Sequence, residues 1–479
     1  MPVALPFLAG MALFVAAWLA PLGLGWLLVG WGVALGVVLS PWRRLGWRYL
    51  GWYCFCLTVV TCPLLLDFVC WFSWQWYLAA AWGVLLLLVW CGYGVWWGGL
   101  WILRSLLLEN TTGRIIYSCK GGECRGRALA WNFVAAGWSL AWFWAVSKLW
   151  IFCCGGDEGI FLFHPLVPLL SCQWARSAVA CLSWPGLTGL LFWYFFATGS
   201  LLARQRWRQA VGLSGLVVAL SFVLELVVNS CGPPAVGPPV GPLLCGCRPF
   251  TVAVPFSYDS HPDNLGRAQR VACAVASCDA AVGSLLVLPE SFLAADLALH
   301  TSVRAVIAGL SVGRAVVCGA QRGCSSGRLA NAMYYFGDGE LVASREKQHL
   351  MPFFERVPAC WGTGGLVCYW RLFGTLPFVA AGQVAPTCWR CGCGWMAVLL
   401  CSELFFTSAL RHLPAYAEAL ALVHDGWFCC SAAAELLWCL AAAKAIGARR
   451  SIGYCSYRYA GHFDRFGRWS AWSSLVGEF

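Results

Sequence analysis

Apolar residues follow two different patterns along this chain. Before residue 230 they form long runs, each close to or beyond the roughly 20 residues that an α-helix needs to cross a bilayer. Only short polar gaps separate these runs. The seven runs cover residues 3–20, 22–39, 53–70, 74–103, 129–152, 178–202 and 211–228. The pattern predicts a multi-span α-helical membrane domain of about seven helices over residues 1–230.

The pattern changes after residue 230. Residues 231–248 are rich in proline and glycine, which disfavour regular structure and indicate a linker. From residue 249 onward, apolar residues occur in short strand-like pieces, at 251–256, 284–290, 313–321, 331–337, 339–347, 395–403 and 419–428. Helical patterns cover 263–283 and 432–450. Residues 249–479 are therefore predicted to form an α/β domain of packed layers.

Composition supports the assignment to the membrane. The chain is 60% hydrophobic and 11% charged, which is too apolar for a soluble protein of 479 residues. The net charge of +11 could indicate nucleic acid binding, but the basic residues of the first half lie in the gaps between apolar runs. Every second gap carries this excess, as in "PWRRLGWRYL" and "RQRWRQ". We therefore expect no nucleic acid partner.

The basic gaps also predict the orientation in the membrane. By the positive-inside rule they are cytoplasmic, so the N-terminus lies inside and the seventh run delivers residues 249–479 to the outer side. In a bacterium that side is the periplasm. The first run has no basic segment before it and is followed almost at once by the second, so it is predicted to remain as an anchor. These features predict a multi-pass protein of the bacterial inner membrane.

Cysteine is frequent, with 28 residues, but its pattern does not predict a metal site. The segment "CWRCGC", with Cys388, Cys391 and Cys393, contains half of a zinc-binding pattern. No matching cysteine or histidine pair follows at ligand spacing, so no metal is expected. An oxidising outer compartment would permit disulfides, whose pairing the sequence does not determine.

Three residues of the second half lie at or near the ends of predicted strands. Glu290 ends "SLLVLPE", Lys347 ends "GELVASREK", and Cys401 follows the apolar part of "WMAVLLCSE". A cysteine thiolate can hold an acyl group as a thioester, provided that a base removes the thiol proton. Glu290 is the candidate base, and the Lys347 ammonium would stabilise negative charge in a tetrahedral intermediate. Taken singly, the three could equally be a surface carboxylate, a solvated amine and a packed thiol.

The order of these residues, and the extended segment "KQHLMPFFERVP", resemble the nitrilase or carbon-nitrogen hydrolase superfamily. The resemblance implies that residues 249–479 form a nitrilase-like α-β-β-α sandwich. It also implies that Glu290, Lys347 and Cys401 act together as a catalytic triad. Such a site needs no cofactor, because the thioester itself carries the activated acyl group.

Several apolar spans followed by such a domain resemble the apolipoprotein N-acyltransferase family of that superfamily. Glu355 matches a glutamate that follows the family's lysine, and Glu403 matches one in its nucleophile motif, so the resemblance implies that both are secondary site residues. The segments "HDGWF" and "FDRFGR" also resemble family motifs. The chain departs from the family at Ser402, which replaces a tyrosine, and at residues 456–458. It also stops at Phe479, where the family continues into a further span.

Two functions follow from these resemblances. The first is a membrane N-acyltransferase, which moves an acyl chain from a phospholipid through a thioester on Cys401 to an amine, such as the N-terminal amine of a lipoprotein. Membrane anchoring favours this function because both substrates lie at the bilayer surface. The alternative is a protein similar to the conjugal transfer family TraB, whose nitrilase-like domain would act on or bind a transfer component. A plain amidase would leave the membrane half without a purpose.

Overall fold

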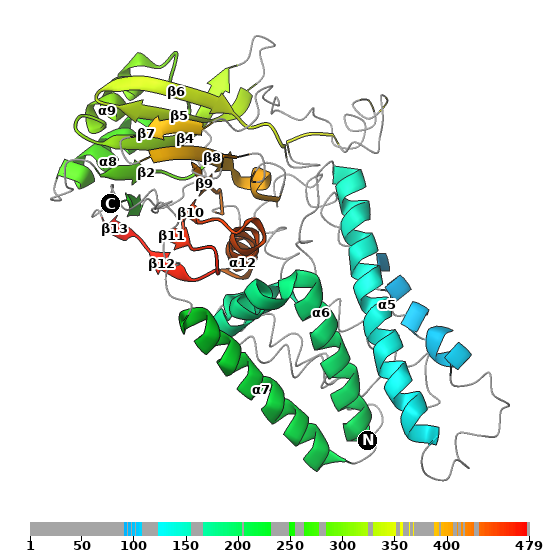
Figure 1. Cartoon of the computed structure of the whole chain (residues 1–479). Coiled ribbons are helices and arrows are strands. Elements are labelled where there is room, and N and C mark those ends of the chain that lie inside the picture. Colours follow the sequence, from blue (N-terminus) through cyan, green and yellow to red (C-terminus); the bar gives the residue numbers. More distant parts are fainter. Residues whose placement is uncertain are drawn as a thin grey trace. The chain divides into compact units, whose positions relative to one another are not determined.

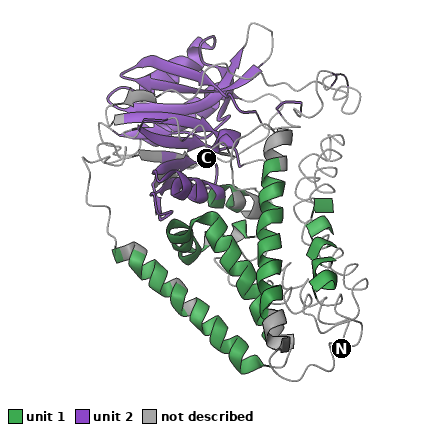
Figure 2. Cartoon of the chain, turned by 45° about the vertical axis from the view of Figure 1, so that its right-hand side comes forward, with its two compact units in different colours: residues 1–149, 161–230, 429–439 green, residues 150–160, 231–428, 440–479 purple. Residues whose placement is uncertain are grey.

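The computed structural model divides the chain into two compact units, which Figure 1 shows by sequence colour and Figure 2 by unit. Unit 1 comprises residues 1–149, 161–230 and 429–439, and unit 2 comprises residues 150–160, 231–428 and 440–479. The segment predicted as a linker lies outside the described residues. Apart from short internal gaps and a few single residues, the structure describes residues 91–107, 123–154, 166–203, 206–230, 249–253, 263–276, 284–323, 329–350, 355–357, 388–391, 394–405, 417–425 and 431–476.

Unit 1 is helical where the structure describes it. Its elements include α5 (Glu123–Cys154) up to residue 149, the short helix η2 (Val167–Ser171), α6 (Gln173–Ala203) and α7 (Trp207–Ser230). Within the described residues, three stretches are long and apolar enough to cross a membrane: Leu129–Lys148, Gln173–Thr198 and Trp207–Val227. These stretches overlap the last three predicted runs. The first three predicted runs, and most of the fourth, lie outside the described residues.

Helix α7 exposes large apolar side chains along its length. Val211, Leu216, Phe222 and Leu226 are each 62–64% exposed. A helix that presents such side chains on its surface is unfavourable in water and favourable against lipid chains. The surface of α7 is therefore that of a helix suited to lipid contact.

Unit 2 contains a first sheet in the order β13-β1-β2-β4-β5-β6, and β3 pairs with β4 at the side of this path. Strands β1, β2 and β4 run parallel, and β4, β5 and β6 form antiparallel hairpins. The last strand pairs in parallel with the first, with Phe250 opposite Ser473. The strands are β1 (Pro249–Ala253), β2 (Leu285–Val287), β3 (Leu293–Asp296), β4 (Ala315–Gly323), β5 (Leu329–Gly337), β6 (Glu340–Glu346) and β13 (Ser473–Val476).

The second sheet of unit 2 has the order β12-β11-β10-β9-β8-β7. Its central strands β8, β9 and β10 are parallel, and its edges are antiparallel. The elements are β7 (Cys388–Cys391), β8 (Gly394–Leu400), the short helix η4 (Cys401–Phe405), β9 (Ala417–Leu422), β10 (Ile452–Cys455), β11 (Ala460–Phe463) and β12 (Trp469–Ala471). Helix α12 (Ser431–Ala448) precedes β10, and its residues from 440 onward belong to unit 2.

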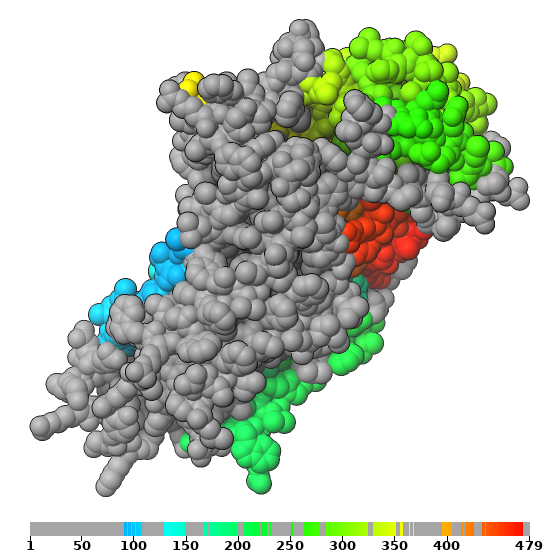
Figure 3. Space-filling view, turned by 180° about the vertical axis from the view of Figure 1, so that it is seen from behind, coloured from blue at the N-terminus to red at the C-terminus, as the bar shows by residue number. Residues whose placement is uncertain are grey.

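Alternation of side chains along the strands builds the layers of unit 2. In β2, Leu285 and Val287 face the second sheet, where they pack with residues such as Val398 and Leu420. Leu286 faces the other way and packs against the crossover helices α8 (Asn264–Ala276) and α9 (Thr301–Leu310). In Figure 3, the part of the chain that contains α8, α9, β4 and β5 forms a green to yellow-green surface.

The second sheet is also covered on both faces. Its inner face packs against the first sheet, and helix α12 connects the parallel strands β9 and β10. Such a crossover must lie on a face of its sheet, which leaves the outer one for α12. The layers are therefore helix, sheet, sheet and helix, which confirms the predicted class of an α/β domain of packed layers.

Several elements were not expected from the sequence. Helix α9 and strands β3, β7, β10, β11, β12 and β13 occur in segments for which the pattern predicts no element.

Cys388 and Cys391, two cysteines of the half zinc-binding pattern, lie in β7, which pairs with β8. Among the described residues there is no group of three or more side chains suited to holding a metal ion.

Candidate active site

The two sheets place the three candidate residues at strand ends that meet. Lys347 directly follows β6 of the first sheet, and Cys401 directly follows β8 of the second. Glu290 lies three residues beyond the end of β2, in a turn. The backbone N–H of Lys347 donates to the carbonyl oxygen of Asn331 on β5, at 2.7 Å, which fixes the chain as it leaves the sheet. The structure thus brings together residues that are far apart in sequence.

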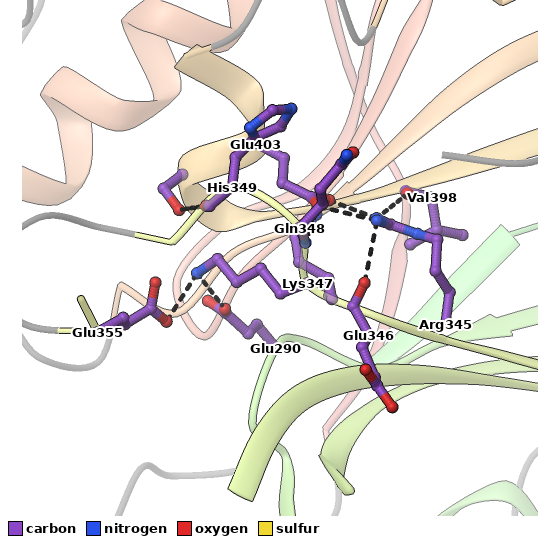
Figure 4. A network of polar contacts seen from close by, with 11 residues as sticks. Glu290, Arg345, Glu346, Lys347, Gln348, His349, Glu355, Val398 and Glu403 are labelled. Atoms are coloured by element: carbon purple, nitrogen blue, oxygen red, sulfur yellow. Dashed lines mark hydrogen bonds and ion pairs between the residues drawn. The ribbon is translucent and has the colours of Figure 1, made fainter. Parts of the chain in front are cut away.

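The amine of Lys347 lies between two carboxylates, as Figure 4 shows. Its Nζ is 2.8 Å from Oε1 of Glu290 and 2.9 Å from Oε1 of Glu355. Lys347 is 1% exposed and Glu290 is 3% exposed. An ammonium has three N–H donors, and these carboxylates take two of them. Within the described residues, the third remains available for the oxygen of a substrate carbonyl.

Burial and charge shift the pKa values of this pair. Burial alone would lower the pKa of the Lys347 amine, but the charges of Glu290 and Glu355 raise it well above its ordinary value. Burial raises the pKa of Glu290, and the nearby Lys347 limits that rise. Lys347 is therefore a fixed positive charge, while Glu290 is a carboxylate that accepts a proton more readily than an exposed one. The sequence left open a surface carboxylate and a solvated amine, and both are excluded by this burial.

The backbone of Cys401 has an unfavourable conformation, which the surrounding structure must stabilise. Its φ is +39°, in the left-handed region that is unfavourable for a residue with a Cβ atom. The thiol is half-buried and lies beside the Glu290 carboxyl and the backbone of His424, which both act on its pKa. Loss of solvent and the Glu290 charge both raise the thiol pKa above its ordinary value. Cys401 is therefore a neutral thiol beside a carboxyl group.

Glu403 ties the end of β8 to the end of β6. Both of its oxygens accept hydrogen bonds from the Arg345 guanidinium, and its Oε1 also accepts from the backbone N–H of Gln348 at 2.7 Å (Figure 4). Its Oε2 accepts from the backbone N–H of Leu400 at 2.9 Å. Burial alone would raise its pKa, but these donors and the Arg345 charge lower it. Glu403 therefore positions the segments that carry Lys347 and Cys401.

Glu355, the other residue matched to a family glutamate, contacts the site directly. Besides Lys347, its Oε1 accepts a hydrogen bond from Nδ2 of Asn331 at 2.6 Å. Asn331 therefore holds Lys347 through its backbone and Glu355 through its side chain. Ser402, at the position where the family has tyrosine, donates through its hydroxyl to the carbonyl oxygen of His349 at 2.6 Å.

The turn that carries Glu290 is shaped by its neighbours. Ser291 has φ of +52°, so the chain turns sharply after the carboxylate. Gly319 of β4 lies directly beneath: a Cβ atom there would lie 2.4 Å from the carbonyl oxygen of Pro289 and 2.5 Å from Cα of Glu290. Only glycine allows this close approach.

Sequence reasoning did not identify Arg345, Asn331 or Gly319 as parts of this site. Arg345 lies two positions before Lys347 in "SREKQHL", and its burial at 3% exposure could have been suspected only if its partner were known. Asn331 is the first residue of the predicted strand 331–337. Asparagine is uncommon in strands, so its presence there could have indicated a residue of the site. Gly319 resembles any other glycine of the sequence.

Comparisons with known proteins give matches only among solved structures, since no protein-family model and no curated protein matches the chain. An amidase from Nesterenkonia sp. is 15% identical over 47% of this chain and 84% of its own, with a TM-score of 0.35. Saccharomyces cerevisiae Nit3, a member of branch 10 of the nitrilase superfamily, is 17% identical over 48% and 86%, with a TM-score of 0.35. A mutant of the amidase, in which acrylamide has added at the active-site cysteine, is 16% identical over 48% and 90%, with a TM-score of 0.34.

These similar structures come from the nitrilase superfamily, which is the superfamily that the sequence motifs resemble. Likeness at this TM-score carries no weight for the activity of this chain. The chemistry of its site rests on its own contacts, which bring a thiol, a carboxylate base and a buried ammonium together.

Proposed function

We propose that unit 2 is an acyltransferase whose nucleophile is Cys401. The observation that carries the proposal is the buried Lys347 amine, held between Glu290 and Glu355 at 2.8 and 2.9 Å beside the Cys401 thiol. Burying two carboxylates and an amine costs folding free energy. If these three groups had only a structural role, apolar side chains could replace them. The presence of these charges next to a cysteine with an unfavourable backbone conformation supports a chemical role.

In the first half of the reaction, the sulfur of Cys401 attacks the carbonyl carbon of an ester while its proton passes to Glu290. The third N–H of Lys347 stabilises the negative oxygen of the tetrahedral intermediate. The carbon–oxygen bond to the alcohol then breaks, and the alcohol takes the proton from Glu290. The product is a thioester on Cys401.

In the second half, a neutral amine attacks the thioester carbonyl, and Glu290 accepts a proton from the amine nitrogen. Lys347 again stabilises the negative oxygen. The carbon–sulfur bond breaks, the sulfur recovers the proton, and an amide leaves. Atoms and charges balance without a cofactor.

For the substrates, we propose a phospholipid as acyl donor and the N-terminal amine of a lipoprotein as acceptor. Support comes from the three apolar stretches of unit 1 and the exposed apolar surface of α7, which suit a chain held at a bilayer. An enzyme held there meets lipid substrates by a local search. We further propose that unit 2 lies on the outer face of a bacterial inner membrane, which a reporter fused after Asn229 tests.

The test of the reaction is mass spectrometry of the detergent-solubilised full chain after incubation with phosphatidylethanolamine vesicles. The wild type should carry an acyl mass on the peptide that contains Cys401, and hydroxylamine should remove it. Cys401→Ala should abolish the adduct, and Lys347→Met should slow its formation by about a hundredfold or more. Cys273→Ala, which removes an exposed thiol on α8, is the control and should change nothing.

An adduct that persists in Cys401→Ala would refute the proposal. A wild type that forms no adduct with any phospholipid, but is required for plasmid transfer, would favour the alternative of a conjugal transfer protein. Adding a synthetic diacylglyceryl-cysteine peptide to the labelled enzyme tests the acceptor, since the acyl mass should move from Cys401 to the peptide amine.

A further inference from the structure

Tyr457 reaches the turn that carries the candidate base. Its hydroxyl donates to the carbonyl oxygens of Ser291 at 3.3 Å and Glu290 at 3.5 Å. Tyr457 follows β10, whereas Glu290 follows β2 of the other sheet. The hydroxyl thus links the second sheet to the turn of Glu290. One of its two contacts is to Ser291, whose backbone is in the left-handed conformation.

The backbone of Tyr457 is itself held by a buried carboxylate. Asp425, at 0% exposure, accepts from the Tyr457 N–H at 2.9 Å and from the Ser456 hydroxyl at 2.6 Å. Asp425 lies just beyond β9, the strand that separates β8 from β10. Ser456 and Tyr457 are also the positions at which the sequence departs from the family motif. The departure therefore does not leave a gap, because these residues make contacts of their own.

The ring of Tyr457 faces the nucleophile's side of the site. Its centroid lies 5.0 Å from that of His424, whose backbone is close enough to the Cys401 thiol to act on its pKa. Burial lowers the pKa of His424 to about 3, so this ring is neutral and packs without adding charge. The Tyr457 side chain therefore contacts the turn of Glu290 through its hydroxyl and the ring of His424 through its own ring.

We propose that Tyr457 is a positioning residue that sets Glu290 against Cys401, with Asp425 as its anchor. The inference rests on the proposed function, because it assumes that Glu290 is the base. The Tyr457 hydroxyl contacts the backbone carbonyls of Glu290 and Ser291, so it acts on proton transfer by fixing where the turn lies. A small displacement of a base is enough to slow a reaction by about a hundredfold.

The test is the rate of Cys401 alkylation by iodoacetamide in the full chain, which needs no natural substrate. Tyr457→Phe keeps the ring and removes the hydroxyl, and should slow alkylation by about tenfold to a hundredfold. In a Glu290→Gln background, the same change should slow it by less than about twofold, because the residue acts through Glu290. Tyr334→Phe is the matched control: it removes hydroxyl bonds to the Asp296 carboxylate and the carbonyl oxygen of Gln321 instead of bonds to the turn of Glu290, and should leave the rate unchanged.

Equal slowing by Tyr457→Phe in both backgrounds would overturn the proposal, and so would equal slowing by Tyr334→Phe. A second pair tests the anchor: Ser456→Ala should slow alkylation, and Ser456→Thr, which keeps a hydroxyl, should restore it. With phosphatidylethanolamine vesicles, Tyr457→Phe should lower kcat for thioester formation and leave KM unchanged. A wild type that alkylates normally but never forms a thioester refutes the proposed function alone, because the alkylation rates still test Tyr457.

Discussion

Replacement of Arg345 by methionine tests whether the pair with Glu403 holds the two sheets at the site. Arg345→Met keeps most of the side-chain volume and removes the guanidinium. Among the described residues, Glu403, which is 0% exposed, would then keep the backbone donors of Gln348 and Leu400. A carboxylate left buried without its counter-charge typically costs about 3–5 kcal/mol, and we expect this loss in the free energy of unfolding.

The loss in the free energy of unfolding depends on the unpaired charge of Glu403. A second substitution that removes this charge should therefore recover part of the lost stability. Glu403→Gln removes the charge and keeps an oxygen that can accept from one of the two backbone N–H groups. The double variant Arg345→Met/Glu403→Gln should therefore be more stable than Arg345→Met alone. We expect a coupling energy between the two sites of about 2 kcal/mol or more.

The assay is urea unfolding of the detergent-solubilised full chain, followed by pulse proteolysis of unit 2. Arg322→Met is the control, because Arg322 pairs with Glu346 at 3.5 Å while the two side chains are 40% and 25% exposed. An exposed pair contributes about 1 kcal/mol or less. Strictly additive effects of the two substitutions, or a loss in Arg345→Met no larger than that of the control, would refute the reasoning.

Two further predictions concern the base. Gly319→Ala should displace the turn of Glu290, because its Cβ would overlap Pro289, and should cost about 1–3 kcal/mol and slow Cys401 alkylation. Gly337→Ala, whose nearest neighbour would be 3.5 Å away, should be tolerated in both assays. Since Glu290 must be ionised to accept a proton and its pKa is raised, alkylation of Cys401 should fall as pH is lowered, with a midpoint above the 4.5 of an ordinary glutamate. Glu290→Gln should remove this acidic limb, and a pH profile that is unchanged in Glu290→Gln would contradict the role of base.

The three candidate residues could be selected from the sequence because each follows a strand that the local pattern reveals. The runs "SLLVLPE", "GELVASREK" and "WMAVLLCSE" are apolar enough to be recognised as strands, and a polar residue at the end of such a run is conspicuous. Their approach in space could be inferred only from the resemblance. The structure supplies the reason, which is that β6 and β8 end close together in two packed sheets.

The supporting residues could not be predicted, because their roles depend on contacts between distant segments. Arg345 is paired across the two sheets with a residue 58 positions away, and nothing local to either one indicates the other. Tyr457 lies in "SIGYCSYRYAGHF", whose mixture of glycine, tyrosine and polar residues conceals the strands β10 and β11. Helix α9 is short, at 10 residues, and its pattern is correspondingly weak.

The pairing of β1 with β13 has a consequence for how unit 2 is made. Phe250 is synthesised long before Ser473, yet the two lie opposite each other in the first sheet. During translation, one edge of β1 therefore remains unpaired until almost the whole domain has left the ribosome. Pairing across so large a separation is slow, and an exposed strand edge invites association with other chains. A chaperone that shields β1 during this interval would protect the nascent protein from aggregation.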